Sequence, residues 1–120
     1  MAGLIVDTSS ILFALSNNID IFNEAEVRLG LNPIISRGIL RELKSKASGR
    51  GKQRAYASAA LELIKRHGVK IEPDAGYVDK WILDSALRFS CVCTNDSKLR
   101  AALRAKGADV RTMSRSGDFR

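Results

Sequence analysis

Hydrophobic residues along the 120-residue chain form two kinds of pattern, which alternate from one end to the other. Short runs of consecutive apolar residues, bounded by turn residues, are typical of strands buried on both faces of a sheet. They predict strands at residues 3–6, 32–36, 69–72, 91–94 and 109–113. Between them, apolar residues recur at helical spacing and predict helices at residues 8–15, 19–29, 37–47, 52–66, 78–89 and 97–106. Ser36 should cap the third of these helices.

The clearest helical pattern lies in the second half of the chain. Apolar and small residues repeat there at i, i+3, i+4, i+7, i+8 and i+11, at Val78, Trp81, Ile82, Ser85, Ala86 and Phe89. Trp81 therefore lies on the buried face, and we expect it in the core rather than on the surface as a platform for stacking bases.

The alternation of strands and helices predicts an α/β fold, in which helices cover both faces of a parallel sheet. No internal repeat or long linker divides the chain, and its length suits one domain spanning residues 1–120.

Composition excludes several classes of protein. About 45% of the residues are hydrophobic and 28% are charged, so the chain is neither disordered nor fibrous. No apolar segment approaches the roughly 20 residues of a membrane span, and no signal peptide is recognisable, so we expect a cytoplasmic protein without a membrane partner. Cys91 and Cys93, at strand spacing in an apolar run, are expected to be reduced core residues. His67 is interpreted as a cation at a helix end.

The net charge is +7, which favours a polyanionic partner or simply confers solubility. Seven basic residues and one acid, Glu42, lie between positions 37 and 54. This run is either a solvated helix face followed by a mobile loop or a contact surface for phosphates.

Four acids follow four of the predicted strands: Asp7, Glu42, Asp79 and Asp96. In a parallel sheet, the segments after the strands gather at the carboxyl edge, so these side chains should share one cleft. Each has a simpler explanation on its own. Asp96 and Asp79 suit a helix N-terminus, and Glu42 can pair with Lys46 one turn later. Asp7 is hardest to explain in this way, because no basic residue adjoins it.

Clustered carboxylates repel one another and raise each other's pKa unless a cation neutralises them. Oxygen ligands favour Mg²⁺ or Mn²⁺, ions that also bind substrate phosphates. An acidic pocket within a basic protein therefore indicates cleavage of a phosphate polymer.

These residues resemble the motifs of the PIN-domain ribonucleases. The matching segments are VDTSS with Asp7, RGILREL with Glu42, D-x-x-I-x-x-x-A starting at Asp79, and TND with Asp96. The resemblance covers nearly the whole chain, and the order and spacing of the four motifs make it fairly specific. It is greatest to small archaeal PIN proteins related to ribosomal RNA processing nucleases, in which a phrase like IFNEA and a basic GRGK-type loop occur.

The resemblance implies a three-layer α/β/α sandwich with a central, mainly parallel five-stranded sheet. It also implies a Mg²⁺- or Mn²⁺-dependent endoribonuclease that cleaves single-stranded RNA, with a ribosomal RNA precursor as one candidate substrate and a homodimer as one candidate assembly.

The resemblance assigns roles to individual residues as well. The four acids would be catalytic and metal-binding, with Ser9, Thr94 and Asn95 supporting them through hydrogen bonds. Thr8 would cap the first helix, and Ser9 or Ser10 would hold Asp7 or a bound water. The expected RNA-binding residues are Arg37, Arg41, Arg50, Lys52, Arg54 and Lys80.

One departure from the family pattern concerns the number of metal ions. Many relatives carry a second acid directly after the third motif's aspartate, where this chain has Lys80. Asp84 does not replace that acid, because five residues along a helix rotate it roughly 140° away from Asp79.

Three other functions remain open. The chain could be the toxin ribonuclease of a toxin–antitoxin pair or an RNA-binding module that does not cut. A phosphotransfer domain with Asp7 as nucleophile is disfavoured, because VDTSS has no second nearby acid.

Overall fold

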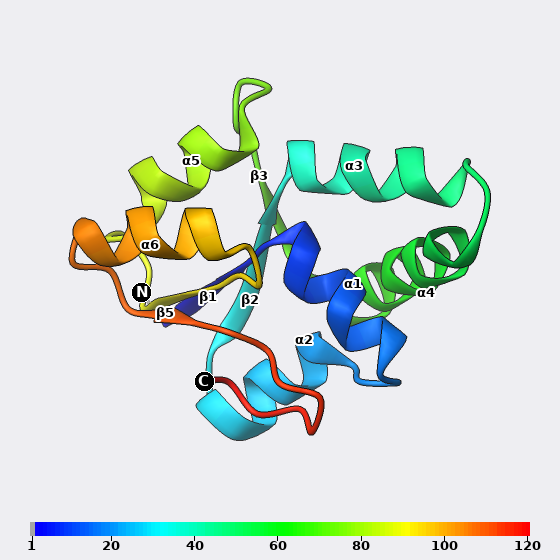
Figure 1. Cartoon of the computed structure of the whole chain (residues 1–120), viewed down its shortest axis with the longest axis horizontal. Coiled ribbons are helices and arrows are strands. Elements are labelled where there is room, and N and C mark those ends of the chain that lie inside the picture. Colours follow the sequence, from blue (N-terminus) through cyan, green and yellow to red (C-terminus); the bar gives the residue numbers. More distant parts are fainter. Residues whose placement is uncertain (1) are drawn as a thin grey trace.

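A five-stranded sheet runs through the middle of the molecule, and all of its strands are parallel (Figure 1). The computed structural model describes residues 2–120, so only Met1 of the expected domain lies outside the described residues. The strands are β1 (Gly3–Val6), β2 (Asn32–Ser36), β3 (Lys70–Glu72), β4 (Cys91–Cys93) and β5 (Val110–Arg111). Their order in space is β3-β2-β1-β4-β5. The α/β class is confirmed, and the sheet, expected to be mainly parallel, is parallel throughout.

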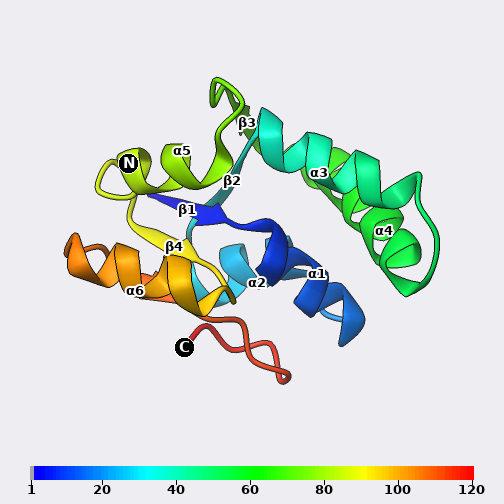
Figure 2. The same ribbon diagram turned by 45° about the horizontal axis from the view of Figure 1, so that its top comes forward.

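Helices form the two outer layers of the sandwich. They are α1 (Thr8–Ser16), α2 (Ile21–Glu24), a π-helical turn η1 (Ala25–Leu29), α3 (Arg37–Ala47), α4 (Lys52–His67), α5 (Val78–Ser85) and α6 (Ser97–Ala105). The two views in Figures 1 and 2 place α1, α3 and α4 on one side of the sheet and α5 and α6 on the other. The three-layer arrangement is therefore confirmed.

Two helix boundaries differ from the prediction by more than one residue. The helix expected at residues 19–29 begins at Ile21, because the side chain of Asp20 caps it by accepting a hydrogen bond from the Asn23 backbone N–H. Helix α5 ends at Ser85 instead of continuing to Phe89. Residues 86–89 form a turn that still brings Phe89 into the core, so the apolar spacing identified the buried residues but not the end of the helix.

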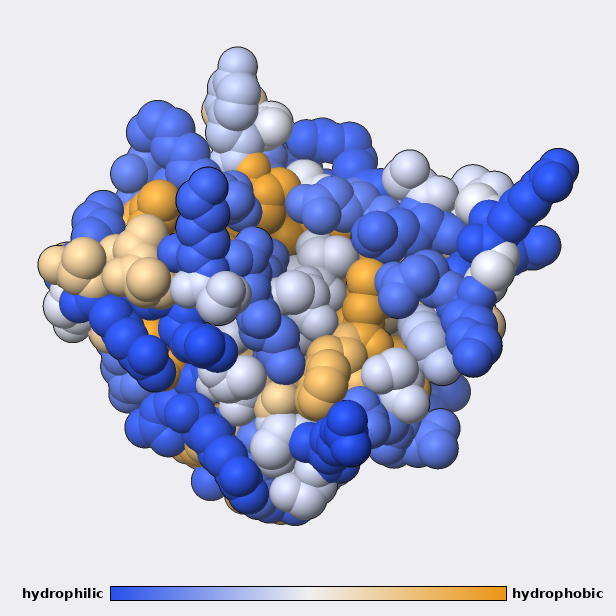
Figure 3. Space-filling view, viewed as in Figure 1, coloured by the Kyte–Doolittle hydropathy of each residue, from blue (hydrophilic) through white to orange (hydrophobic). Residues whose placement is uncertain are grey.

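The core consists of the side chains that the hydrophobic pattern indicated. Trp81 and Phe89 are each only 7% exposed, so Trp81 is a core residue as expected. Cys91 and Cys93 are buried free thiols, and burial raises the pKa of each to about 12. The face seen in Figure 3 is largely hydrophilic, with smaller apolar areas between the charged side chains. No helix among residues 2–120 combines the length and the apolar character needed to cross a bilayer.

The order of the strands fixes where a ligand site should lie. From β1 the chain moves outward to β2 and β3 on one side, and it then returns to β4 and β5 on the other side of β1. The direction therefore reverses between β1 and β4. In doubly wound sheets, the carboxyl ends of the strands at such a reversal form the usual binding crevice.

Candidate active site

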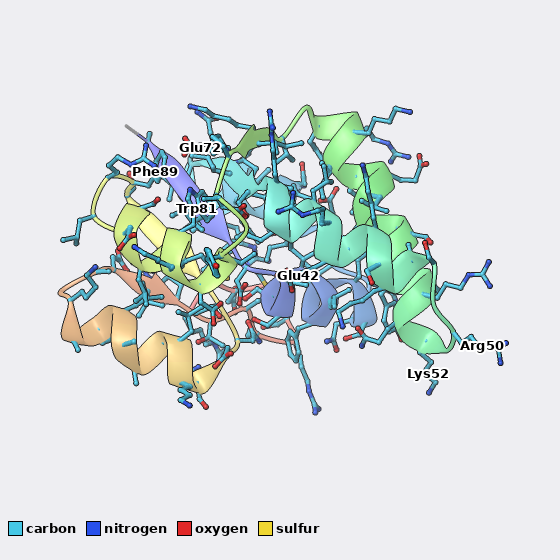
Figure 4. The ribbon with its side chains drawn as sticks, turned by 90° about the horizontal axis from the view of Figure 1, so that it is seen from above. Glu42, Arg50, Lys52, Glu72, Trp81 and Phe89 are labelled. Atoms are coloured by element: carbon cyan, nitrogen blue, oxygen red, sulfur yellow. The ribbon has the colours of Figure 1, made fainter. Side chains whose placement is uncertain are left out.

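A cleft of about 280 Å³ lies at this reversal point, and all four predicted acids line it. Asp7 directly follows β1, Glu42 lies in α3, Asp79 lies in the first turn of α5, and Asp96 precedes α6. Figure 4 looks down on this edge of the molecule and shows Glu42 near its centre. The remaining lining residues are Thr8, Ser9, Leu12 and Lys46. The structure thus brings together the four acids that were expected to share one cleft because they follow parallel strands.

Asp7 is the buried member of the group, with 7% of its surface exposed. Its Oδ2 accepts hydrogen bonds from the hydroxyls of Ser9 at 2.9 Å and Thr94 at 2.8 Å. Burial raises the pKa of Asp7, and the charge of Asp79 adds to this, although the two hydroxyls and the Thr8 backbone N–H oppose it. Asp7 is therefore held in one orientation in an environment that disfavours its charged form.

The hydroxyl residues after Asp7 divide their roles differently from the expectation. Asp7, not Thr8, occupies the capping position of α1, and its side chain makes no capping hydrogen bond. Thr8 is the first residue of the helix, so the prediction that it caps α1 is wrong. Ser9 holds Asp7, whereas Ser10 donates to Asn95 Oδ1 at 2.6 Å.

Asn95 connects the site to the C-terminal segment. Its side-chain amide donates to the carbonyl of Met113 at 3.1 Å, and its side-chain oxygen accepts from the Met113 backbone N–H. Its own backbone N–H donates to Ser9 Oγ at 3.0 Å. Its support of Asp7 therefore passes through the backbone and Ser9, while its side chain fixes residues 113 and 10.

Glu42 lies on the exposed surface of α3 and faces the same cleft. Its pKa is raised by partial burial first and then by the charges of Asp7 and Asp79, whereas Thr8 and Lys46 act in the opposite direction. Lys46 lies one turn after Glu42, so the expected i,i+4 attraction exists. It does not cancel the repulsion from the other acids, because its effect on the pKa of Glu42 is smaller than that of Asp7 and that of Asp79.

Asp79 and Asp96 complete the rim of the cleft, and both are exposed. The charge of Asp79 contributes to the raised pKa of both Asp7 and Glu42, so these three acids interact electrostatically. Asp96 caps α6, because its Oδ1 accepts from the backbone N–H groups of Lys98 at 2.9 Å and Leu99 at 3.1 Å. Its Oδ2 takes no part in the cap. The helix-cap interpretation and the cleft position are therefore both correct for Asp96.

The side chains do not form a ready-made metal centre. Within residues 2–120, no three histidine, cysteine, aspartate or glutamate side chains lie close enough together to hold an ion. The donor set nevertheless fits a hard divalent cation, since it consists of carboxylate oxygens whose mutual repulsion a cation would relieve. The hydroxyl of Thr8 is buried at the cleft with no partner in hydrogen-bonding geometry, although it lies near enough to favour the charged form of Glu42. Glu42 and Asp79 are exposed, so their side chains can rotate inward.

The predicted RNA-binding residues fall into separate groups. Arg37 and Arg41 line a second hollow at the start of α3. Arg50, Lys52 and Arg54 lie at the other end of α3, in the loop before α4 and in the first turn of α4, and Figure 4 shows the first two pointing outward.

Lys80 lies outside both groups. Its Nζ pairs with Asp84 Oδ2 at 2.6 Å, and neither residue lines the cleft. Asp84 therefore does not supply the second acid of the third motif, in agreement with the helical-rotation argument.

Two residues of interest were not assigned a site role from the sequence. Lys46 faces the acids, and its position one turn after Glu42 was the available signal. Asp74, in the turn between β3 and α5, is 8% exposed and accepts a hydrogen bond from the Gly38 backbone N–H at 2.7 Å. The turn-forming sequence PDAG was the only sign of Asp74's role, and nothing local pointed to a partner 36 residues away.

The fold and the acidic cleft together define a class of α/β proteins whose carboxylates gather at the carboxyl edge of a parallel sheet. A family model described as a PIN-like domain matches residues 4–115. The chain therefore belongs to the PIN-like domain family. PIN domains are generally nucleases that use divalent metals.

Solved structures agree with this assignment. The PIN domain endonuclease Utp24 is similar over 93% of this chain and 85% of its own, with a TM-score of 0.75 and 25% sequence identity. A domain of a functionally unknown protein from Methanocaldococcus jannaschii DSM 2661 matches over 95% of this chain and 92% of its own, with a TM-score of 0.64. At 18% identity, the second similarity concerns the fold alone. A comparison with curated protein sequences gives no match.

Proposed function

We propose that this protein is a metal-dependent endoribonuclease that cleaves single-stranded RNA. The observation that carries the proposal is the convergence of Asp7, Glu42, Asp79 and Asp96, from four separate segments, on one cleft at the reversal point of the sheet. A structural role would leave such charges paired, yet the pKa values of Asp7 and Glu42 are raised.

Each acid would have a distinct part in the site. Asp7, fixed by Ser9 and Thr94, would be the rigid ligand, whereas the exposed Glu42 and Asp79 would turn toward a bound ion. Asp96 would contribute the oxygen not used by its helix cap. A bound Mg²⁺ or Mn²⁺ would help an attacking water lose its proton and stabilise charge on the attacking and leaving oxygens. Lys46 is placed to attract the phosphate group toward the acids.

The finer aspects of the proposal come from the family resemblance. We propose a ribosomal RNA precursor as the substrate class, a homodimer as the assembly and the cytoplasm as the location. The basic residues at both ends of α3 would hold the RNA backbone on either side of the cleft.

A non-catalytic RNA-binding module is the second candidate. It would use the same basic residues at both ends of α3 and would need no bound cation. The toxin ribonuclease interpretation shares all four acids and differs only in the partner, so it predicts the same chemistry.

Cleavage of labelled single-stranded RNA tests the proposal. Wild type and Asp7→Asn are incubated with Mn²⁺, Mg²⁺ or EDTA. Asp7→Asn is a close steric match, because both hydroxyls bind the same oxygen, Oδ2, which an amide oxygen can replace. We expect metal-dependent cleavage by the wild type only. Binding without cleavage in every tube would reject the nuclease and support the module.

A further inference from the structure

Among the phenylalanine, tyrosine and tryptophan residues within residues 2–120, only Tyr77 is largely exposed. It lies in the loop between β3 and α5, and 70% of its surface is open to solvent. Single exposed apolar residues are common on protein surfaces, so exposure alone carries no argument. Its surroundings are what distinguish Tyr77.

The loop that presents Tyr77 is firmly held. Ala75 and Gly76 both adopt left-handed backbone conformations, with φ values of 54° and 87°. The Asp74 carboxylate stabilises this turn, since Oδ1 accepts from the Gly76 backbone N–H at 3.0 Å and Oδ2 accepts from the Gly38 backbone N–H at 2.7 Å. A ring on a rigid loop loses little freedom when a ligand stacks on it.

The start of α3 lies directly against the start of α5. A β-carbon placed on Gly38 would be 2.5 Å from Val78 Cγ2, so a larger residue would require the neighbouring side chains to shift. Arg37 precedes Gly38 and Tyr77 precedes Val78. The backbones of Arg37 and Tyr77 are therefore each one residue from this contact.

Positive charge lies against the segment that directly precedes Tyr77. Arg37 and Arg41 line a hollow of about 420 Å³ together with residues 73–76. Arg37 makes no ion pair within residues 2–120. Arg41 pairs with Asp74 Oδ1 at 3.6 Å, but its side chain is 63% exposed, so part of the guanidinium faces solvent. These groups form what we call the Tyr77 patch, consisting of Arg37, Arg41 and Tyr77.

We propose that the Tyr77 patch binds the single-stranded RNA next to the cleaved bond, with one base stacked on Tyr77 and phosphates on the two arginines. Aromatic rings beside a basic groove are the usual means of binding unpaired nucleotides. The inference rests on the proposed function, because the same strand must reach the acids.

The patch and the cleft share two helices. Glu42 follows Arg41 and is rotated about 100° around α3, so the two residues face neighbouring sectors of one helix. Asp79 lies only two residues after Tyr77. An RNA strand bound to the patch would therefore lie close in the sequence and on α3 to the carboxylates of the cleft. An acidic protein segment would also match the arginines, but it would offer no base to stack on the exposed ring of Tyr77.

Binding measured without cleavage tests the patch. A short fluorescent single-stranded RNA is titrated in EDTA with wild type, Tyr77→Ala and Tyr77→Phe. Leu87→Ala is the matched control, because Leu87 is 65% exposed and lies beyond the other end of α5. We expect Tyr77→Ala to weaken binding about tenfold and the other two variants to bind within about twofold of wild type.

A series of RNAs with one base removed then identifies the stacked nucleotide. At one position, loss of the base should weaken wild-type binding about tenfold and leave Tyr77→Ala unaffected. Wild-type affinity in Tyr77→Ala, or the absence of any such position, would overturn the inference. A polyglutamate peptide is tested in the same way. If Tyr77→Ala weakens binding of the peptide but not of RNA, the inference is overturned in favour of a protein partner. Affinity is measured in EDTA, where no cleavage occurs. A failure of the patch and a failure of the proposed nuclease activity can therefore be told apart.

Discussion

Asp7 and Asp74 are two aspartates with nearly equal exposed surface whose pKa values are shifted in opposite directions. They are 7% and 8% exposed, and both follow strands at the carboxyl edge of the sheet. Burial raises the pKa of Asp7, and the charge of Asp79 adds to it. Burial acts upward on Asp74 as well, but hydrogen bonds from Ser36, Gly76 and Gly38, together with the charge of Arg41, lower its pKa.

The difference distinguishes a carboxylate with a structural role, Asp74, from one in the candidate ligand site, Asp7. Asp74 satisfies backbone N–H groups of α3 and of the turn before α5, so its charge stabilises the structure. Asp7 is stabilised by the hydroxyls of Ser9 and Thr94 and by the Thr8 backbone N–H, but it has no basic partner and faces other acids. Burial alone does not indicate a functional site. A functional site is indicated by a carboxylate that is held in a fixed orientation and has no compensating basic partner.

The largest effect should follow from removing the hydroxyls that orient Asp7. We expect Ser9→Ala and Thr94→Val each to lower the RNA cleavage rate about 10- to 100-fold, since outer partners of metal ligands typically matter to this extent. Asp20→Asn is the control, because Asp20 pairs with His67 at 2.8 Å and lies outside the cleft. Unchanged rates in both hydroxyl variants would mean that the orientation of Asp7 is not used in catalysis.

The comparison predicts opposite stability changes for the two aspartates. Asp74→Ala leaves the N–H groups of Gly38 and Gly76 without their partner and should lower the unfolding free energy by about 1–3 kcal/mol. Asp7→Asn in metal-free protein should not lower it, because the amide keeps both hydroxyl contacts and removes a repelled charge. Denaturant unfolding at neutral pH measures both.

The dependence on pH sharpens this contrast. The pKa of Asp7 is raised above 3.8, so the folded chain holds the proton more tightly than the unfolded chain. The protonated form therefore contributes stability below pH 3.8. This contribution is lost as the pH rises through the raised pKa. The pKa of Asp74 is lowered, so its contribution is present above 3.8 and is lost as the pH falls through the lowered value. A destabilised Asp7→Asn would show that Asp7 is structural, like Asp74.

A third test addresses the close approach that holds Asp74 in place. A β-carbon on Gly38 would lie 2.2 Å from Asp74 Oδ2, so Gly38→Ala should destabilise the protein by about 1–3 kcal/mol. Gly49→Ala is the matched control, since its nearest contact is a backbone oxygen at 3.4 Å. Equal melting temperatures for the two variants would show that the loop moves away at little cost.

The smallest effect concerns the basic loop at the far end of α3. Alanine at Arg50, Lys52 and Arg54 should weaken RNA binding similarly for all sequences and reduce the slope of log affinity against log salt by roughly one for each phosphate that is no longer neutralised. Single-stranded RNAs of different sequence, titrated at several salt concentrations, measure this. An unchanged slope would remove the loop from the RNA-binding surface.

Much of the fold was predictable because its signals are local. The apolar runs at β1 and β2 matched the observed strands, and Ser36 caps α3 as expected. The grouping of the four acids followed from the topology of parallel sheets alone. These features depend on spacing and handedness, which the sequence encodes directly.

The features that were missed depend on tertiary contacts. Thr8 was expected to cap α1, but it is already the first helical residue, so Asp7 occupies the capping position. The role of Asp74 requires the start of α3 to touch the loop before α5, which no local pattern encodes. The end of α5 at Ser85 reflects a turn that carries Phe89 inward, and apolar spacing cannot distinguish that turn from a longer helix.

Direct titration with Mn²⁺ in the absence of RNA tests the central claim, that the carboxylates around Asp7 form a cation site. Calorimetry of the wild type should show saturable binding that Asp7→Asn largely abolishes and that Asp20→Asn leaves intact. Absence of saturable binding in the wild type, or equal binding by Asp7→Asn, would contradict the account.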